Sequence, residues 1–202
     1  MIYLIITCCI HNKVGNENAE LRNKQYIQSI TSVLELVKND TSIKPIIVEN
    51  NGVRRTYLYT LGCDVVYTNN NRENYPHKGM NELLDIHSVI RSYNIQDNDI
   101  IIKITGRYTL LDKTFIENVK NTTYDAYIKF FNVCTKEFRN DDCVLGLFAM
   151  RCKYLKNFKY TFNKSAECDF ATYVRESIPN LQEINSLNLK CCFADDLRTL
   201  IV

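Results

Sequence analysis

The sequence contains little glycine and proline, with six Gly and three Pro in 202 residues. Low-complexity chains, collagen-like repeats and flexible linkers need far more of both residues, so these classes are excluded. No apolar run reaches the roughly 18–20 residues that cross a membrane as a helix. The longest run, residues 2–10, has no basic segment before it, so we expect a strand there rather than a signal peptide.

The sequence also has little excess charge of either sign, with a formal net charge of +2 at pH 7. Proteins that bind nucleic acid carry a clear excess of basic residues, and so do polybasic arms that bind membranes. We therefore expect neither nucleic acid nor a membrane among its partners.

The nine cysteines form no Cys-X-X-Cys pair, which is the usual spacing of structural zinc ligands. Their number is odd, and most of them lie in apolar stretches, where a thiol packs as a small hydrophobic group. Reduced thiols are typical of a cytosol-like compartment, so we expect a cytoplasmic protein.

The first half of the chain alternates apolar, β-branched runs with segments of helical periodicity. Strands are predicted at residues 2–10, 45–48, 64–67 and 99–105, and helices at 19–38, 57–61 and from residue 80. Further strands are predicted at 125–131, 144–150 and 190–194, and helices at 151–158 and 167–176. This order predicts one α/β domain with a mixed, mainly parallel sheet flanked by helices.

Polar residues lie at or just after the carboxyl ends of the predicted parallel strands. Ligands of open α/β sheets bind beyond the carboxyl ends of the strands, so these residues are candidates for a binding site. They are Thr7, Asn12, Glu49, Asn50 and Arg107. The sequence contains neither GxGxxG nor GxxxxGK[ST], which argues against dinucleotide-binding Rossmann domains and P-loop enzymes.

Lys78 and Gly79 precede the helix predicted from residue 80. The free N–H groups of a helix start, the helix dipole and a lysine charge together favour a phosphate. The alternative is that Lys78 is an ordinary exposed lysine.

Four stretches carry a family resemblance: V-E-N-N-G at 48–52, N-N-N-R-E-N-Y-P-H-K-G-M-N-E at 69–82, I-I-I-K-I-T-G-R-Y at 100–108 and C-V-L-G-L-F-A-M-R-C-K-Y-L at 143–155. Together they resemble GT-A glycosyltransferases, and especially the small nucleotide-sugar transferases of large DNA viruses. The resemblance implies a UDP-sugar or related donor, a glycan or glycoprotein acceptor such as a viral capsid glycan, and a place in the host cytoplasm. It also implies a single domain over 1–202, with a nucleotide-binding half (1–110) and an acceptor half (111–202).

The sequence departs from GT-A enzymes at the expected metal site. These enzymes usually carry Asp-X-Asp at the carboxyl end of the fourth strand, where it holds Mn²⁺ against the diphosphate. Here Thr105-Gly106-Arg107 takes that place, and the Asp-X-Asp at 97–99 precedes the strand, where we expect a solvated turn. Either Arg107 neutralises the diphosphate through bidentate contacts, or another acid such as Asp195 binds Mn²⁺ or Mg²⁺.

A glycosyl transfer that inverts the anomeric centre needs a general base. The candidates are Asp141, Asp142, Glu167, Asp169, Asp195 and Asp196. Glu167 begins a helix after a loop, which is where the base of GT-A enzymes commonly lies. A helix dipole also favours an acid in the first turn, with Ser165 as N-cap, so this position has a purely structural explanation too. Asp195 and Asp196 follow a predicted strand and are the main rivals.

Two other functions remain open. One is a non-catalytic module of the same fold that binds a nucleotide-sugar or a glycan. The other is a nucleotidyltransferase, which would need a glycine-rich triphosphate loop near the first strand, where Gly15 is the only glycine.

Overall fold

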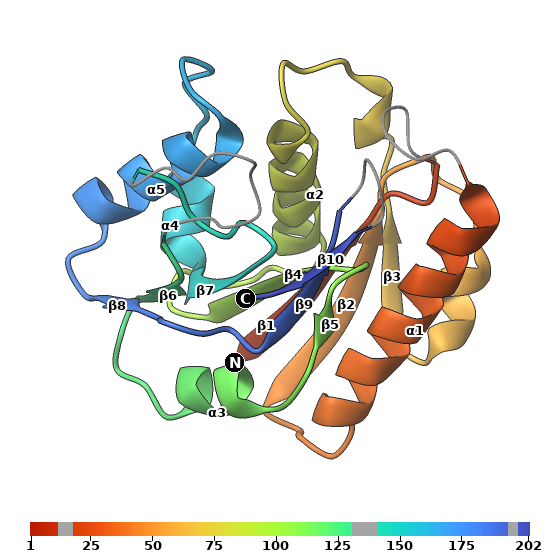
Figure 1. Cartoon of the computed structure of the whole chain (residues 1–202), viewed down its shortest axis with the longest axis horizontal. Helices are drawn as coiled ribbons and strands as arrows, with labels where there is room; N and C mark the ends of the chain where they lie inside the picture. The colour runs from red at the N-terminus through yellow and green to blue at the C-terminus, as the bar shows by residue number, and fades with distance from the viewer. Residues whose placement is uncertain (12–17, 131–140, 194–197) are drawn as a thin grey trace.

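A seven-stranded sheet, in the order β3-β2-β1-β4-β7-β6-β8, forms the centre of the computed structural model (Figure 1), which describes residues 1–11, 18–130, 141–193 and 198–202. Its strands are β1 (Ile2–Cys8), β2 (Ile43–Glu49), β3 (Asp64–Tyr67), β4 (Ile100–Thr105), β6 (Ala126–Ile128), β7 (Leu147–Arg151) and β8 (Leu181–Glu183). Strand β7 runs antiparallel to its neighbours β4 and β6, and the other neighbouring pairs are parallel. The predicted single α/β domain with a mixed, mainly parallel sheet is confirmed.

Helices cover both faces of this sheet. The helices α1 (Ala19–Val37) and α3 (Thr114–Lys120) pack on one face, and α2 (Gly79–Ser92), α4 (Cys152–Asn157) and α5 (Ala166–Ser177) pack on the other. Side chains of a strand point alternately to the two faces, so β1 sends Leu4 and Ile6 toward α1 and Ile5 toward α2. All three side chains are at most 1% exposed, so β1 contributes to the apolar core on each face of the sheet.

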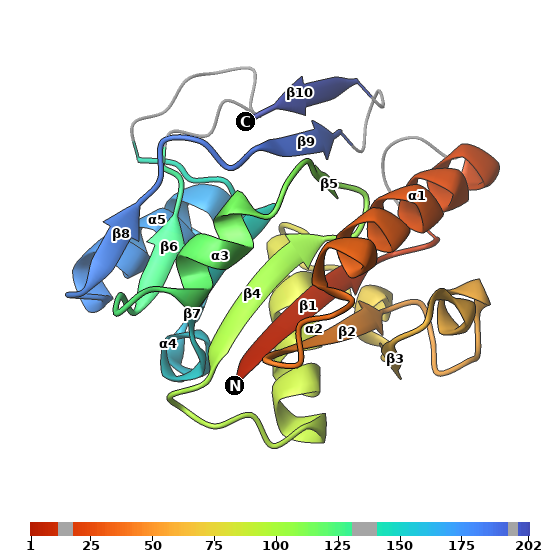
Figure 2. The same cartoon turned by 90° about the horizontal axis from the view of Figure 1, so that it is seen from below.

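A smaller antiparallel sheet has the order β10-β9-β5, with β5 (Thr109–Leu110), β9 (Leu189–Cys192) and β10 (Thr199–Ile201). Figure 2 shows it on the same side of the large sheet as α1 and α3, with α2 and α4 on the opposite side. Its apolar residues Leu110, Leu189 and Cys191 join the core beneath α1. This packing brings the end of β9 next to the segment that follows β4.

The sequence-based predictions and the structure agree best for the long elements. The helix predicted at 19–38 is α1, and the short helix predicted at 57–61 is the 3₁₀ segment η1 (Tyr57–Leu61), which ends at Gly62 in the left-handed region (φ +90°). The predictions missed α3, β5, β8, β10 and the 3₁₀ turn η2 (Asn70–Arg72). These elements have three to seven residues, or two in β5, which is too short for a clear periodicity.

Among the described residues, no helix combines the length and the apolar character needed to span a membrane. The eight cysteines in this part of the chain take part in no disulfide.

Candidate functional site

A polar cleft opens beyond the carboxyl ends of β1, β2 and β4. One compartment lies between α1 and α2, where Thr7, Arg22, Asn50 and Arg107 are among its lining residues. A second compartment continues past β4 toward α5, where Glu167 lines it. Lys78, Glu82, Thr105 and Arg107 line both compartments, so the two form one cleft, which we call the strand-end cleft.

The structure brings most of the sequence-predicted site residues to this cleft. Thr7, Asn50, Lys78 and Arg107 line the first compartment, and Glu167 lines the second. Asn12, Asp195 and Asp196 lie outside the described residues.

Glu49 is not among the residues that line the strand-end cleft. It is fully buried, and its Oε1 accepts a hydrogen bond from the backbone N–H of Asn51 (3.1 Å). Alternation along β2 puts Glu49 with Ile47 on the α1 side of the sheet, whereas Val48 faces α2. Nδ2 of Asn51 also donates to Oε1 of Glu49, so Asn51 holds this buried carboxylate, whereas the next residue after Glu49, Asn50, lines the cleft.

Two buried arginines line the first compartment of the cleft. Arg22, only 4% exposed, donates from Nε and Nη2 to the carbonyl oxygen of Cys9 (3.0 and 2.9 Å). Arg107, 8% exposed, donates from Nη1 to the carbonyl oxygen of Cys192 on β9. Nη1 of Arg22 and Nε of Arg107 are buried without a hydrogen-bond partner in the described part of the chain. Since an unpaired buried donor is costly, a bound anion would stabilise this arrangement.

Lys78 is exposed, as the alternative interpretation of the sequence expects, and it also lines both compartments, where it adds a third cation at the start of α2. Partial desolvation lowers its pKa, and the charges of Arg22 and Arg107 lower it further, against the opposite influence of Cys9 and Glu82. The two arginines and the lysine thus repel one another across the same space, and an anion bound between them would remove that repulsion.

Gly106 sets the position of Arg107. Its backbone N–H donates to the carbonyl oxygen of Thr7 (2.9 Å), and a Cβ at this position would lie 2.8 Å from the sulfur of Cys8 and 3.1 Å from that oxygen. Any larger residue would push the chain away from β1. Glycine therefore lets the segment after β4 pass closely over β1 and place Arg107 in the cleft.

Helix α2 continues the predicted Lys78 into a polar stripe whose other members, Asn81, Glu82 and Asp85, were not predicted from the sequence. Lys78, Asn81 and Glu82 all line the cleft, and Asp85 lies one turn below Asn81 and Glu82. Their spacing of three and four residues puts them on one helix face. The apolar periodicity of this helix predicted only its core-facing side. The three- and four-residue spacing of the polar residues is the sequence signal that would have predicted the side facing the cleft.

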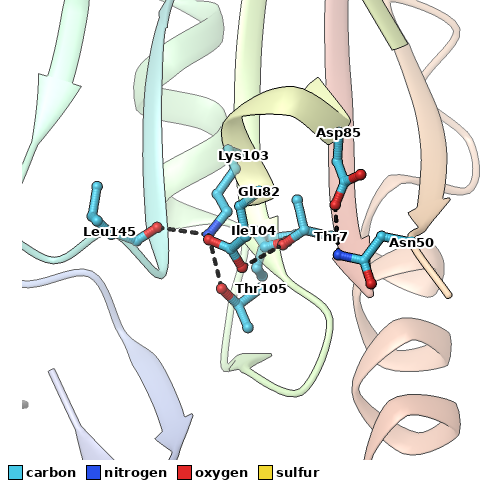
Figure 3. A network of polar contacts seen from close by, with 8 residues as sticks. All are labelled: Thr7, Asn50, Glu82, Asp85, Lys103, Ile104, Thr105 and Leu145. Carbon is cyan, nitrogen blue, oxygen red and sulfur yellow. Dashed lines mark hydrogen bonds and ion pairs between the residues drawn. The ribbon is translucent and has the colours of Figure 1, made fainter. Parts of the chain in front are cut away.

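Lys103 holds the floor of the cleft together (Figure 3). It is 1% exposed, and its Nζ donates to Oε2 of Glu82 (2.9 Å), Oγ1 of Thr105 (2.9 Å) and the carbonyl oxygen of Leu145 (2.8 Å). Glu82 in turn accepts from Oγ1 of Thr7 (3.1 Å). All three ammonium protons are thus used, which compensates the burial of the charge. A single lysine inside an otherwise apolar strand was the sequence signal for this network.

Asp85 connects α2 to the ends of β2 and β3. This fully buried carboxylate accepts from Nδ2 of Asn50 (2.8 Å), Oγ1 of Thr68 (2.8 Å) and Nδ2 of Asn70 (2.7 Å). Burial raises the pKa of Asp85 to about 7, although the three hydrogen bonds favour the charged form. The side chain therefore fixes Asn50, which lines the cleft, and titrates near neutral pH.

The raised pKa predicts a specific pH dependence of stability. An aspartate has a pKa of about 3.9 in an unfolded chain, so between pH 4 and pH 7 the folded state holds a proton that the unfolded state has lost. The stabilisation is fully present below about pH 4 and is lost as the pH rises through 7, by about 1.4 kcal/mol per pH unit.

Asp85→Asn cannot titrate at this position, so it serves as the reference. We expect the unfolding free energy of the wild type, relative to that of Asp85→Asn, to fall by about 2–3 kcal/mol between pH 5 and pH 8. Urea unfolding of both proteins across this range measures it. A difference that does not change with pH would contradict the titration of Asp85 in the folded protein.

The described residues do not fit a divalent-metal site in the cleft. No three His, Cys, Asp or Glu side chains gather in the part of the chain that the structure covers. Glu82 and Glu167 are the acids that line the cleft there, and Glu82 already binds Lys103 and Thr7. The carboxyl end of β4 offers Thr105 and Arg107 instead of acids. At the carboxyl end of β4, where GT-A enzymes usually bind a metal ion, this protein therefore has the cationic side chain of Arg107.

The Asp-X-Asp at 97–99 lies at the amino end of β4, as the sequence indicates. Asp97 is two-thirds exposed and pairs with Lys156 (2.6 Å), and Asp99 accepts from the backbone N–H of Gln96 (2.9 Å). Both contacts are those of a polar turn at the surface.

Three other candidate bases are engaged away from the cleft. Asp141 pairs with Lys164 (3.7 Å), Asp142 is 1% exposed and accepts from the N–H of Cys143, and Asp169 is 6% exposed. None of them lines either compartment of the cleft. Ser165 caps α5 as predicted, accepting from the N–H of Cys168 (3.2 Å), and Glu167 follows in the first turn.

Comparisons with known proteins give similar folds but no family. No family model and no curated protein matches this chain. A CMP-2-keto-3-deoxy-manno-octonic acid synthetase in complex with CTP is similar, with a TM-score of 0.56, 11% identity, and coverage of 91% of this chain and 88% of that one. The galactosyltransferase LgtC, in complex with donor and acceptor sugar analogues, has a TM-score of 0.53, 8% identity, and coverage of 92% and 73%.

A mannosyltransferase from Pyrobaculum calidifontis, in complex with GDP-mannose and Mn²⁺, matches over 98% of this chain and 55% of its own, with a TM-score of 0.52 and 9% identity. The chain thus has the GT-A-like fold that its sequence resembles. Enzymes that transfer sugars and enzymes that transfer nucleotides share this fold, so the fold does not choose between them.

Proposed function

We propose that the protein transfers a sugar from a nucleotide-sugar, in the first place a UDP-sugar, to a glycan or glycoprotein acceptor. The observation that carries this proposal is the pair of buried guanidinium groups in the strand-end cleft. Arg22 and Arg107 each keep an N–H without a partner in the described part of the chain, and Lys78 faces the same space. Planar guanidinium groups and an ammonium suit the oxygens of a diphosphate.

The two compartments support a donor site in the first compartment and an acceptor site in the second. In the first, the amide side chains of Asn50, Asn71 and Asn81 stand next to the cations, where they can hydrogen-bond a base or a ribose. In the second, Glu167 faces the space beyond Arg107, so the acceptor would enter from the α5 side.

Under this proposal the reaction is an attack by an acceptor hydroxyl on the anomeric carbon of the donor. In an inverting transfer, Glu167 takes the proton of that hydroxyl as general base while the bond to the diphosphate breaks. The negative charge that develops on the leaving diphosphate lies against Arg107, Lys78 and Arg22, which are already in place before the reaction. These residues supply the positive charge without a metal, and a Mn²⁺ or Mg²⁺ ion held by Asp195 is the alternative, which EDTA treatment tests.

A panel of donors tests the proposal. The protein is incubated with UDP-, GDP-, dTDP- and CMP-sugars together with mixed glycan acceptors. Viral capsid glycans are included among the acceptors because the sequence resembles viral transferases. We expect one donor to release its nucleotide and to add one sugar mass to an acceptor. Nucleotide binding without any transfer would favour the non-catalytic binding module. A parallel incubation with nucleoside triphosphates and free sugars or sugar phosphates tests the other enzyme class: release of pyrophosphate there would instead show a nucleotidyltransferase.

A further inference from the structure

Three aromatic side chains stand together at the α5 end of the strand-end cleft. His77 precedes α2, and Tyr160 and Phe162 belong to the loop between α4 and α5; Figure 1 shows this loop at the same end of the molecule as the start of α2. The ring of His77 lies 4.5 Å from that of Tyr160 and 5.2 Å from that of Phe162. We call these three side chains the rim aromatics.

The rim aromatics border the compartment that holds Glu167. A Cβ on Gly79 would lie 2.7 Å from the hydroxyl of Tyr160 and 2.8 Å from Cβ of Ala166. Gly79, Ala166 and Glu167 all line the second compartment of the cleft. Tyr160 therefore packs directly behind the cleft wall, and Phe162 extends the same cluster outward.

The backbone of Phe162 has a conformation that is unfavourable for a bulky residue, although its side chain is exposed. Its φ of +62° lies in the left-handed region, which residues with a bulky side chain rarely adopt. The side chain is 42% exposed, so burial does not account for the strain. A strained conformation that the surroundings maintain is a reason to look for a function of the side chain it presents.

Asp169 of α5 maintains this conformation. Its buried carboxylate accepts from the backbone N–H of Thr161 (2.8 Å), the hydroxyl of Thr161 (2.7 Å) and the backbone N–H of Phe162 (3.1 Å). The helix that carries Glu167 in its first turn thus also fixes the loop that carries Phe162. Helix α5 therefore carries Glu167 and, through Asp169, holds the backbone of Phe162.

We propose that the rim aromatics, with Phe162 foremost, form the subsite for a pyranose ring of the acceptor. One face of a pyranose carries C–H bonds, which pack well on the electron-rich face of an aromatic ring, while its hydroxyl groups stay in water. Phe162 is connected through His77 and Tyr160 to Gly79 in the wall of the compartment that Glu167 lines, so a sugar stacked on Phe162 would lie at that end of the cleft. The assignment to the acceptor rests on the proposed function, whereas the assignment of a sugar-binding surface stands on the rim aromatics themselves.

Phe162→Ala tests the subsite directly. Binding is measured by saturation-transfer difference NMR with a panel of methyl pyranosides, including glucosides, galactosides, mannosides and fucosides. We expect Phe162→Ala to weaken the binding of the preferred pyranoside by about threefold to tenfold and Phe162→Tyr to retain it. The control is Tyr59→Ala, which removes a similarly exposed ring (53%) from η1 and should leave saccharide binding unchanged.

A second variant separates the loss of the ring from a loss of folding. Glycine adopts positive φ freely, so Phe162→Gly removes the ring and relieves the backbone strain at the same time. We expect its melting temperature to equal or exceed that of the wild type while saccharide binding is weakened as much as in Phe162→Ala.

The outcomes distinguish the subsite from the proposed function, because UDP binding is followed in the same samples. Saccharide binding that depends on Phe162 supports the subsite, even if UDP does not bind and the proposed function fails. A wild type that binds no pyranoside, or variants that bind as the wild type does, would overturn the subsite. So would a Phe162→Ala variant that loses UDP affinity and keeps saccharide affinity, since the ring would then belong to the donor site.

Discussion

Replacing Glu167 with glutamine is expected to lower the rate of sugar transfer by about 10²- to 10⁴-fold, the usual contribution of a general base. Glutamine has nearly the same shape as glutamate but cannot accept the proton of the acceptor hydroxyl. The affinity for UDP should stay within about twofold, because Glu167 lines the second compartment and not the one with Asn50 and Arg22. Initial rates with the donor and acceptor found in the panel measure the first quantity, and calorimetry measures the second.

The matched control for this experiment is Glu176→Gln, an exposed acid in the last turn of the same helix, which should leave the rate unchanged. Asp195→Ala and Asp196→Ala are measured beside it, since both acids remain candidates. A Glu167→Gln enzyme with the wild-type rate, together with a large loss in one of the aspartate variants, would show that Glu167 is a first-turn acid without a catalytic role.

Removing a cation from the cleft should weaken UDP binding strongly. A charge-assisted hydrogen bond contributes about 1.5–3 kcal/mol, so Lys78→Ala should lower the affinity by roughly 10- to 150-fold. Arg107 also holds the carbonyl oxygen of Cys192, so Arg107→Lys is preferred to alanine because it keeps a charge and a donor there. We expect Arg107→Lys to lose affinity too, because lysine cannot reproduce the planar guanidinium contact.

Isothermal titration of UDP measures these affinities, and thermal melting confirms that each variant is folded. Lys38→Ala is the control, because this exposed lysine follows the last residue of α1 and does not line the cleft. Unchanged UDP affinity in both the Lys78 and the Arg107 variant would rule out the diphosphate site.

The sequence predicted the part of the fold that carries the cleft, for reasons that the structure makes clear. Strands β1 and β4 are apolar runs buried on both faces, and α1 repeats its apolar residues at helical spacing. Such signals depend on local pattern alone. By contrast, β5 and β10 are two and three residues long and exist because they pair with β9, which no local pattern shows.

The candidate site was predictable where it depended on strand ends and not where it depended on side-chain partners. Thr7, Asn50 and Arg107 were predicted because polar residues at or just after the ends of parallel strands are candidates for a binding site. Arg22 and Asp85 lie on helices, where a polar residue is expected to face water, and only their contacts across the fold show that they are buried.

Glu49 illustrates the sensitivity of such predictions to strand alternation. It directly precedes Asn50, which lines the cleft, but it points to the opposite face of the sheet, toward α1. In a strand, a shift of one residue reverses the face to which a side chain points.

The most direct measurement is the thermal stability of the wild-type protein with and without UDP, UDP-sugars and GDP-sugars. Each is repeated with Mn²⁺ and with EDTA, and NAD and ATP serve as comparison ligands. A ligand at about 100 times its dissociation constant stabilises a protein by roughly 2.7 kcal/mol, which for a chain of this size raises the melting temperature by about 5–11 °C. We expect this shift with UDP, much smaller shifts with NAD and ATP, and no change on adding EDTA, because Arg22, Lys78 and Arg107 supply the positive charge. A shift that EDTA abolishes would show a metal bound by acids outside the described residues, such as Asp195. No shift with any uridine or guanosine diphosphate sugar, with or without Mn²⁺, would contradict the assignment of the strand-end cleft as a nucleotide-sugar site.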